Sequence, residues 1–484
     1  MNNKLSYVDL CKGSFGRKVA YTGVSAITSE NVLKVVGRAV SVLNYNRPFI
    51  RYLHDYYMGD QPILYREKPV RPEINNKTVE NHALEIVRFK AGQTYGEPIQ
   101  YVSRKTDEVI NKAVDTLNDY MRDAHKQARD IELGIWQSSV GTAYKATLKA
   151  DKNNPVPFRI HIPTPLNTIV VYSQEDGRDM LSIQQLKDEN ERQYYLCFSV
   201  DKYFIIKNGQ VTKSGLNGFE GIPITEYPNN PDRLSDIEIV ITALDQMNKI
   251  QSDRMNGIEQ FVQAFMLFKN CEISKDEFIE MSQLGAIQVK DAGQANKSEV
   301  KLMTAELNQE QTQVSKDDVY RQVLVVEGMP DRQQNTGGDT GQAVYLRNGW
   351  DFAEQRAKLD EPFIIEAEKK HCQIVLNIIK QTVNDVPLTV RDFDVKITRN
   401  STDNMLVKAQ ALDYLLKNKV NPLIALTTCG LFGDPEKVWI MSKPYMDTLF
   451  KTQEQLDIEA EKQRAFELLK NPSNNSTVGT GEAE

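Results

Sequence analysis

Apolar residues recur at helical spacing along residues 221–269, and the rest of the chain is organised around this stretch. It opens with a short apolar strand over residues 222–227, which a Pro-Asn-Asn-Pro turn ends because proline cannot donate a hydrogen bond to a sheet. Ser235 then stands three residues before Glu238, which is the spacing of a helix capping box. We therefore predict a helix over residues 235–268, roughly 50 Å long at about 1.5 Å per residue.

The predicted helix carries two apolar stripes, which favours contacts with more than one neighbour along its length. Polar Asn248 and Gln251 fall on the first stripe and dilute it. The first stripe consists of Ile237, Ile241, Leu244, Met255, Ile258, Val262 and Phe265, and the second consists of Val240, Met247, Ile250 and Phe261.

The chain before this helix begins with a helical part. Residues 1–29 are polar and poorly patterned, which predicts an arm or a loop. Helical spacing follows over residues 28–57, where Pro48 is expected to break the helix, and again over residues 75–92 and 107–135.

Short runs rich in Val, Ile and Tyr alternate with Gly, Asn and Asp turns between residues 140 and 227. Asn208 and Gly209 join the last two runs and are a strong signal for a β-hairpin. The pattern as a whole predicts an antiparallel meander. Its strands are expected at residues 158–162, 168–172, 181–186, 194–200, 203–206 and 211–213.

Two further helices are predicted after the long helix. Residues 270–308 read as a small mixed unit with short strands at 286–290 and 300–303. A helix over residues 309–327 follows and leads into a polar, glycine-rich loop. The next helix, over residues 340–383, contains Pro362, which is expected to kink or split it.

In the last part of the chain, the pattern predicts one or two strands over residues 386–398 and short helices over residues 403–450. A charged helix is expected over residues 454–469, and the polar residues after it are expected to be disordered. The mixture of long helices with a separate antiparallel meander indicates an α+β protein.

Composition and charge narrow the class of protein. The chain has 484 residues, of which 40% are hydrophobic and 26% charged, as expected for a soluble protein of a few domains. It has neither an apolar run long enough to span a membrane nor the pattern of a signal peptide. The net charge of −7 does not predict a surface that grips DNA, but it suits a surface past which DNA slides. The scattered cysteines, which indicate reduced thiols, are Cys11, Cys197, Cys271, Cys372 and Cys429.

The sequence contains no recognisable catalytic or metal-binding motif, so we predict no enzyme activity, no cofactor and no metal. Phosphate-binding loops, His-Glu zinc motifs, Cys-x-x-Cys pairs and nucleophile elbows are all missing. Residues 13–16 are glycine-rich but lack the spacing of a phosphate loop, and the carboxylates of residues 331–341 do not alternate as in a calcium loop. Residues 331–341 are either a plain linker or a functional loop, since such loops between long helices are often functional.

The order of these elements and several short motifs resemble the portal proteins of long-tailed bacteriophages, specifically the family whose type member comes from a Bacillus siphophage. The most specific motif is GIPITEYPNNPDRLSDIE, which begins at Gly221. Thr340 stands where the family usually has Ser, and both residues cap helices. The other matching motifs are YYMGDQPI at 56–63, NNKTVENHALEIVRFKAGQTYGEP at 75–98 and NTGGDTGQAVYL at 335–346.

This resemblance, which covers roughly residues 30–450, implies a portal fold. The implied fold has an α/β wing with antiparallel strands, a stem of long helices, a small α/β clip and a mainly helical crown. The implied parts are an N-terminal arm (1–29), the wing (30–234), stem helices (235–268 and 309–328), the clip (269–308), a channel loop (329–341), a long linking helix (342–384), the crown (385–450) and a partly disordered tail (451–484).

The resemblance also implies a function and partners. Portal proteins form rings, usually of twelve copies, at one capsid vertex of the virion after assembly in the host cytoplasm. Double-stranded DNA passes through the ring during packaging and ejection without sequence-specific contacts. The implied partners are the terminase large subunit, a head-completion or adaptor protein, and the major capsid and scaffolding proteins, with no membrane.

Two sets of residues are candidates for this function. The first set is expected to line the narrowest part of the channel, because its small polar side chains suit a weak sliding contact with DNA. It consists of Asp331, Arg332, Gln333, Gln334, Asn335, Thr336, Gly337, Gly338 and Asp339. The second set belongs to the first stem helix and consists of Ser235, Glu238, Ile241, Leu244, Ile258 and Val262.

Other classes of protein fit the sequence less well. An enzyme of the packaging machine, such as a nuclease or an ATPase, would be expected to carry a phosphate loop or a carboxylate–metal cluster, and neither is visible. Another ring-forming head–tail connector would usually be much shorter than this chain. A coiled-coil scaffold would lack the meander and the loops.

Overall fold

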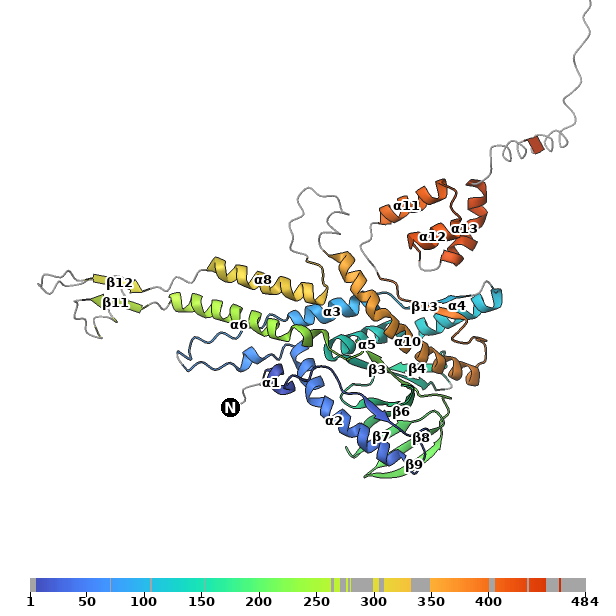
Figure 1. The fold of residues 1–484 in the computed structure, drawn as a ribbon, viewed down its shortest axis with the longest axis horizontal. Coiled ribbons are helices and arrows are strands. Elements are labelled where there is room, and N and C mark those ends of the chain that lie inside the picture. Colours follow the sequence, from blue (N-terminus) through green and yellow to red (C-terminus); the bar gives the residue numbers. More distant parts are fainter. Residues whose placement is uncertain are drawn as a thin grey trace, which may run out of the picture. The chain divides into compact units, whose positions relative to one another are not determined.

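The computed structural model divides the chain into two compact units, Met1–Ser401 and Thr402–Glu484. In the described part of the chain, all sheets lie in the first unit and the second unit is helical (Figure 1). Long helices combined with separate, mostly antiparallel sheets make the fold α+β, as the sequence predicted. The described residues are 6–69, 71–104, 107–151, 153–262, 265–269, 276, 279, 299–303, 309–331, 349–399, 405–432, 435–449 and 461–462.

The described residues of the N-terminal segment form a helix and a strand within the first unit, so the predicted loop is wrong, while the N-terminal arm stays a prediction. Helix α1 (Tyr7–Cys11) is followed by strand β1 (Ala20–Thr22), which joins the largest sheet. The side chains of Tyr7 and Arg17 are buried. The pattern missed this segment because its few buried residues are too widely spaced to form a stripe.

Helix α2 (Val32–Tyr57) continues through Pro48, where the sequence analysis expected a break. Proline costs a helix one hydrogen bond and crowds the preceding turn. Here, that cost is offset by burial of the apolar residues that follow, among them Phe49, Leu53 and Tyr56.

The largest sheet has the strand order β1-β5-β6-β7-β8-β9. Strand β1 pairs parallel to β5, while the other neighbours are consecutive antiparallel strands, so the predicted meander is confirmed. Asn208 and Gly209 have φ values of 49° and 74°, as a tight hairpin turn requires. Helix α2 packs on this sheet through an apolar cluster that includes Val36 and Phe204. The strands are β5 (Thr168–Ser173), β6 (Asp179–Lys187), β7 (Gln193–Phe198), β8 (Lys202–Lys207) and β9 (Gln210–Leu216).

A second, antiparallel sheet has the order β10-β3-β4. The predicted strand at 158–162 belongs to this sheet and not to the meander. The sequence analysis missed β3, because six consecutive residues of that strand are buried and the alternation of apolar and polar positions is lost. The strands are β3 (Thr142–Lys149), β4 (Phe158–His161) and β10 (Ile224–Pro228).

Helices α4 (Glu108–Asp123), α5 (Lys126–Val140) and α10 (Trp350–Thr382) pack around this sheet. A single helix was predicted over residues 107–135, but His125 has a left-handed φ of 53° and separates α4 from α5. The split expected at Pro362 does not occur, since α10 is one continuous helix.

A short antiparallel pair of strands shows where the first unit ends. Strand β2 (Gln100–Ser103) pairs with β13 (Phe393–Lys396), and Phe393 is fully buried in the core around α10. A strand was predicted over residues 386–398, and β13 confirms it in part. The described residues up to 399 therefore belong to the first unit, whereas the sequence analysis began a new part at residue 385.

The core of the first unit contains a closed group of buried charges. Lys145 Nζ lies 2.7 Å from Asp130 Oδ1 and 2.9 Å from Glu368 Oε2, and Lys126 bonds to the same two carboxylates. The hydroxyl groups of Tyr101 and Tyr227 also donate to Glu368, at 2.6 and 2.8 Å. Burial raises the pKa of Glu368, but the two lysines outweigh burial and hold it well below its usual value. These charges join α5, β3 and α10.

The region predicted as stem and clip contains two helices and a two-stranded sheet. Helix α6 (Asp236–Val262) is shorter than predicted, because Phe265–Lys269 forms strand β11 and pairs with β12 (Glu299–Met303). Short apolar runs such as this one fit a helix or a strand equally well by sequence. The strand predicted at 300–303 is confirmed, and the one predicted at 286–290 lies outside the described residues. Helix α8 (Gln309–Glu327) matches its prediction and lies along α6 (Figure 1).

The second unit consists of short helices in its described residues, as predicted. Asn421 caps the middle helix by accepting a hydrogen bond from the Leu423 N–H at 2.9 Å, and Gly430 ends it with a φ of 56°. The charged helix predicted at 454–469 lies almost entirely outside the described residues. The helices are α11 (Met405–Lys417), α12 (Pro422–Cys429) and α13 (Pro435–Leu449).

Candidate functional site: the α6 and α8 helix pair and the loop base

One half of the capping box predicted for α6 is present, since Glu238 accepts from the Ser235 N–H, while Ser235 caps the Ile237 N–H and not that of Glu238. Ser235 Oγ accepts a hydrogen bond from the Ile237 N–H at 3.1 Å, and Glu238 Oε2 accepts one from the Ser235 N–H at 3.3 Å. Ser235 Oγ also donates to the carbonyl oxygen of Ser139 at 2.7 Å. The cap therefore fixes the first turn of α6 to the end of α5 as well as starting the helix.

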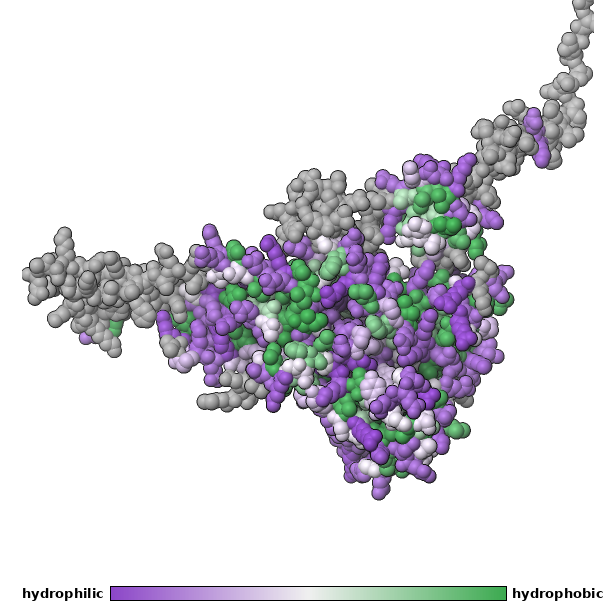
Figure 2. Space-filling view, viewed as in Figure 1, coloured by the Kyte–Doolittle hydropathy of each residue, from purple (hydrophilic) through white to green (hydrophobic). Residues whose placement is uncertain are grey.

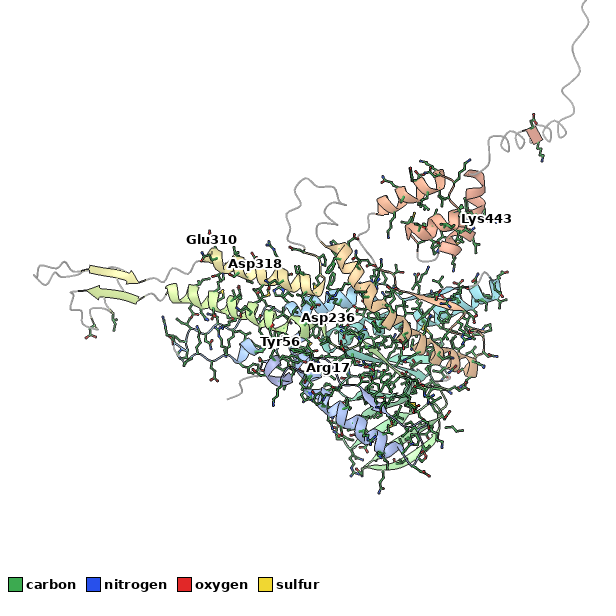
Figure 3. The ribbon with its side chains drawn as sticks, viewed as in Figure 1. Arg17, Tyr56, Asp236, Glu310, Asp318 and Lys443 are labelled. Atoms are coloured by element: carbon green, nitrogen blue, oxygen red, sulfur yellow. The ribbon has the colours of Figure 1, made fainter. Side chains whose placement is uncertain are left out.

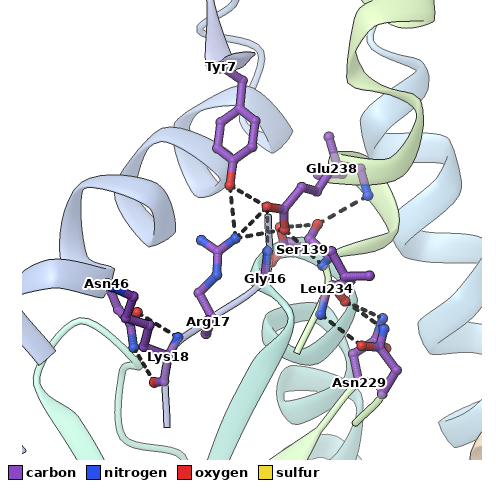
Figure 4. Close-up of polar contacts among 12 residues, drawn as sticks. Tyr7, Gly16, Arg17, Lys18, Asn46, Ser139, Asn229, Leu234 and Glu238 are labelled. Atoms are coloured by element: carbon purple, nitrogen blue, oxygen red, sulfur yellow. Dashed lines mark hydrogen bonds and ion pairs between the residues drawn. The ribbon is translucent and has the colours of Figure 1, made fainter. Parts of the chain in front are cut away.

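The carboxylate of Glu238 is held by the N-terminal segment (Figure 4). Arg17 Nη2 lies 2.7 Å from both Glu238 oxygens, the Gly16 N–H donates at 2.9 Å and the Tyr7 hydroxyl donates at 2.6 Å. The side chains of Arg17 and Glu238 are 1% and 0% exposed. Burial raises the pKa of Tyr7 well above its usual value, so this hydroxyl remains a donor.

Gly16 is required at its position, and this explains the glycine-rich residues 13–16. Its φ is 78°, and a Cβ atom there would lie 2.3 Å from the carbonyl oxygen of Asp232. Glycine alone permits this left-handed turn and close approach. The glycines of this segment therefore have a structural reason that is unrelated to phosphate binding.

The apolar stripe of α6 is buried in its first half and exposed in its second half. Ile241 and Leu244 are 1% and 2% exposed, whereas Met255 and Ile258 are 39% and 46% exposed. Val262 ends the helix, and its side chain is not among those described. A single chain thus leaves part of the stripe without an apolar partner.

Polar residues of α6 form a ladder with an extended segment, residues 76–80. The N–H groups of Glu80, Thr78 and Asn76 donate to Asn248 Oδ1, Ser252 Oγ and Asn256 Oδ1 at 2.8, 2.9 and 2.7 Å. Because these residues are extended, helix α3 (His82–Tyr95) begins later than the predicted residue 75. Asn248, which interrupts the apolar stripe, thus serves as a buried hydrogen-bond acceptor. Ser252 and Asn256, which are also buried, do the same.

Helix α8 is attached to α3 and α6 by a second polar group. Lys316 Nζ donates to Glu80 Oε1 and, at 3.1 Å, to Gln251 Oε1, while the Tyr320 hydroxyl donates to Glu85 Oε1 at 3.1 Å. His82 lies between Glu80 and Glu85. Burial lowers the pKa of His82, but the two carboxylates outweigh burial and raise it to about 9, so the imidazole is cationic at neutral pH.

Helix α3 holds the last residue of α8 and the first turn of α10, and we call this junction the loop base. Lys90 Nζ donates to the main-chain oxygen of Glu327, the last residue of α8, at 2.6 Å. Gln93 Nε2 donates to the main-chain oxygen of Ala353, in the first turn of α10, at 3.1 Å. Gly328 and Met329 close α8 by donating to the carbonyl oxygens of its last turn. The described residues on either side of residues 332–348 are therefore both fixed to α3.

Acidic side chains from three helices gather at this loop base. They are Asp236 of α6, Glu327 of α8 and Asp360 of α10, with Lys90 and Arg356 as the nearest cations. Burial and the charge of Asp236 raise the pKa of Glu327 to about 8, although both cations lower it. Burial and Asp236 likewise raise the pKa of Asp360 to about 6.

The outer side of α8 carries both acidic and apolar side chains. Glu310 and Asp318 are exposed on this helix, and Asp236 lies at the start of α6 (Figure 3). Figure 2 shows apolar residues gathered along the helix pair, where Val314 and Val325 are 60% and 69% exposed. The exposed apolar side chains of this surface offer contact area to a protein.

The described residues contain no group of three or more His, Cys, Asp or Glu side chains that could hold a metal ion. Within the same residues, no helix is both long enough and apolar enough to cross a membrane.

The structure brings four of the predicted site residues together. Ser235, Glu238, Ile241 and Leu244 lie in the cap and first turns of α6, against α5 and the N-terminal segment. Residues 332–339 lie outside the described residues, while Asp331 lies 4.0 Å from Arg321. Sequence reasoning missed Arg17 and Glu327, because an isolated charged residue carries no signal of its burial.

A comparison with protein-family models gives a match over residues 41–467 to the model described as "Phage portal protein, SPP1 Gp6-like". No curated protein sequence matches the chain.

Solved structures with a similar fold come from gene transfer agent (GTA) particles. "Neck of empty GTA particle computed with C6 symmetry" has a TM-score of 0.44 at 12% identity, and covers 69% of this chain and 85% of that one. "Virion of native gene transfer agent (GTA) particle" has a TM-score of 0.46 at 10% identity, with 79% and 93% covered. "Neck of native GTA particle computed with C12 symmetry" has a TM-score of 0.45 at 13% identity, with 72% and 89% covered.

Proposed function

The chain belongs to the phage portal protein family, SPP1 Gp6-like, with a portal protein's role at the capsid vertex, and we propose that it acts there as a closed ring of identical subunits. The observation that carries this function is the family match over residues 41–467, which is most of the 484-residue chain. The family is structural and not enzymatic. We further propose that the ring has twelve subunits and surrounds the path of double-stranded DNA during packaging and ejection.

The exposed half of the α6 stripe supports contact between identical subunits. Met255 and Ile258 on α6 and Val314 on α8 are large apolar side chains that a single chain leaves exposed. In a ring, each subunit has one neighbour on either side, so both sides of the helix pair can be covered. Burial of this area would stabilise the ring by roughly 25 cal/mol per Å² of apolar surface.

Ring assembly tests this proposal directly. The variant Ile258→Asp places a charge in the proposed contact, and we expect it to shift the population from rings to monomers in native mass spectrometry. The matched control is Leu216→Asp on β9, which is 82% exposed and lies outside the helix pair. Wild-type protein that stays monomeric under assembly conditions would contradict the ring, whereas a ring of thirteen would change only the subunit number.

We keep the parts implied by the resemblance as our assignment, with boundaries changed where the helices and the two units differ from them. The first stem helix ends at Val262, so the clip is proposed to begin with β11, and the crown is proposed to begin after Ser401. The helix predicted over residues 340–383 begins only at Trp350, after the left-handed Gly349, so the linking helix is proposed to be α10 (Trp350–Thr382). The wing (30–234), the second stem helix (309–328) and the tail (451–484) are unchanged. Of the proposed arm, the described residues 6–29 anchor the stem through Glu238.

We propose that the loop over residues 329–341 lines the narrowest part of the channel and touches DNA without reading its sequence. The test is to delete residues 333–337 and, separately, to make the double variant Gln333→Lys, Gln334→Lys. Rings should form in both cases, because the proposed contacts lie on α6 and α8. Packaging or retention of DNA should fail in at least one variant, since added lysines bind phosphate and slow sliding. If both variants package and retain genomes normally, the loop is a linker.

The remaining partners are proposed from the family alone. The clip is assigned to docking of the terminase large subunit and later of a head-completion or adaptor protein. Contacts with the major capsid and scaffolding proteins are assigned to the outside of the ring. ATP turnover or DNA cleavage by the pure protein, abolished by a point substitution in this chain, would favour an enzyme of the packaging machine instead.

A further inference from the structure

Glu327 combines deep burial with incomplete pairing at the base of the predicted channel loop. Its side chain is 1% exposed, and Oε1 has no hydrogen-bond partner in the described structure. Oε2 lies 3.6 Å from Lys90 Nζ, which makes its shorter contact, at 2.6 Å, with the main-chain oxygen of Glu327. An ionised carboxylate in this position would be poorly compensated, whereas a neutral carboxyl group is tolerated.

We propose that the Glu327 carboxyl group is a proton-controlled latch that holds the loop base closed when it is protonated and loosens it when it ionises. The latch follows from the packing of α3, α6, α8 and α10, and only its effect on a DNA channel rests on the proposed function. For the proposed DNA channel, the latch would add control by pH at the loop base.

The charges around Glu327 explain why ionisation would open the junction. Helix α3 contributes Lys90, α6 contributes Asp236, and α10 contributes Arg356 and Asp360. Asp236 is fixed in place, because its two oxygens accept hydrogen bonds from Ser138 Oγ at 2.6 Å and Asn229 Nδ2 at 3.0 Å.

A newly ionised Glu327 would therefore meet the charge of Asp236, which Lys90 and Arg356 offset only in part. Repulsion between buried carboxylates is relieved by separation or by entry of water.

A cavity lies next to charged groups that act on Glu327, although Glu327 itself is not among its lining residues. Its volume is about 40 Å³, and Lys90, Asp236 and Asp360 are among its lining residues. This is enough room for a water molecule with several polar partners. Burial raises the pKa of Glu327 to about 8, so the latch would respond to small changes around neutral pH.

Hydrogen–deuterium exchange of the full-length protein tests the latch. Exchange is followed in peptides covering residues 321–331 and 349–360 between about pH 6 and pH 9, with labelling times scaled to the intrinsic exchange rate. We expect protection to fall as the pH rises through the pKa of Glu327 in the wild type. Glu327→Gln keeps the shape of the protonated group and should remove this dependence. The matched control Glu310→Gln, at the exposed start of α8, should behave as the wild type.

A second variant tests the electrostatic cause. Lys90→Met removes a cation that favours the ionised form, so the transition should move to higher pH. A flat wild-type profile, a Glu327→Gln variant that keeps the transition, or a Lys90→Met variant whose transition moves down or stays in place would each overturn the latch. Failure of the proposed function would show instead as loss of rings or of packaging with this exchange profile intact.

Discussion

Glu368 on α10 and Glu327 on α8 are both buried glutamates, but their surroundings are opposite. Glu368 meets two lysines and two tyrosine hydroxyl groups, while Glu327 has one oxygen without a partner and its nearest ammonium 3.6 Å away. The pKa of Glu368 is accordingly held well below its usual value, against the effect of burial, whereas burial raises that of Glu327 to about 8.

The comparison shows that burial by itself does not set the charge of a carboxyl group; the completeness of its pairing does. In this chain the fully paired group lies in the core around α10, and the incompletely paired one lies at the base of a loop. The first group suits a rigid part of the fold and the second a part that responds to pH.

Lys145→Met should give the largest loss of stability. It leaves Asp130 and Glu368 with one lysine fewer in a site with no access to water, and breaking a buried ion pair costs about 3–5 kcal/mol. The urea midpoint of unfolding measures this effect. Lys149→Met, on the exposed end of the same strand, is the matched control and should change it little. Equal midpoints for the two variants would show that the buried charges are not needed for stability.

The pH dependence of stability should differ between wild type and Glu327→Gln by roughly 2–3 kcal/mol between pH 5 and pH 7. The pKa of Glu327 is about 8 when folded, above the usual 4.5 of the unfolded chain, so the folded state binds the extra proton in this range.

The contribution of the Glu327 proton to the free energy of unfolding is complete below about pH 4.5 and declines as the pH rises towards 8. Denaturation followed at several pH values measures the slope attributable to this group. Glu368 should act in the opposite direction, because its lowered pKa contributes stability that is lost as the pH falls below its usual value. A Glu327→Gln variant with the wild-type slope would refute the first assignment.

Ser252→Ala removes a buried acceptor without changing any charge, and it should have the smallest effect, roughly 1–2 kcal/mol. It leaves the Thr78 N–H without its 2.9 Å hydrogen bond to Ser252 Oγ. Thr242→Ala, at an exposed position of the same helix, controls for helix propensity. If thermal unfolding shows the two variants to be equally stable, the ladder does not contribute to stability.

Sequence patterns predicted the elements whose apolar residues repeat regularly. The meander around Asn208 and Gly209, the cap of α6 at Ser235 and the extent of α8 all follow from periodicity or from turn chemistry. These signals are local, so they survive without knowledge of the tertiary contacts.

The errors occurred where tertiary contacts override local signals. Strand β3 is buried along most of its length, Pro48 is tolerated within a packed helix, and Phe265–Lys269 pairs as a strand. At the candidate site, the cap was predictable but the contacts of Arg17 and Glu327 were not. Those contacts depend on segments far apart in the sequence, and no pattern within one segment reports them.

The ladder between α6 and residues 76–80 has a mechanical consequence. Every second residue of an extended segment advances about 6.6 Å, and every fourth residue of a helix about 6.0 Å, so a few rungs match before the mismatch accumulates. A slip of one residue would turn all the bonded N–H groups at positions 76, 78 and 80 away from their acceptors at once. A force along the axis of α6 would therefore be passed to residues 76–80 without slippage, so that the helix and this extended segment would move together.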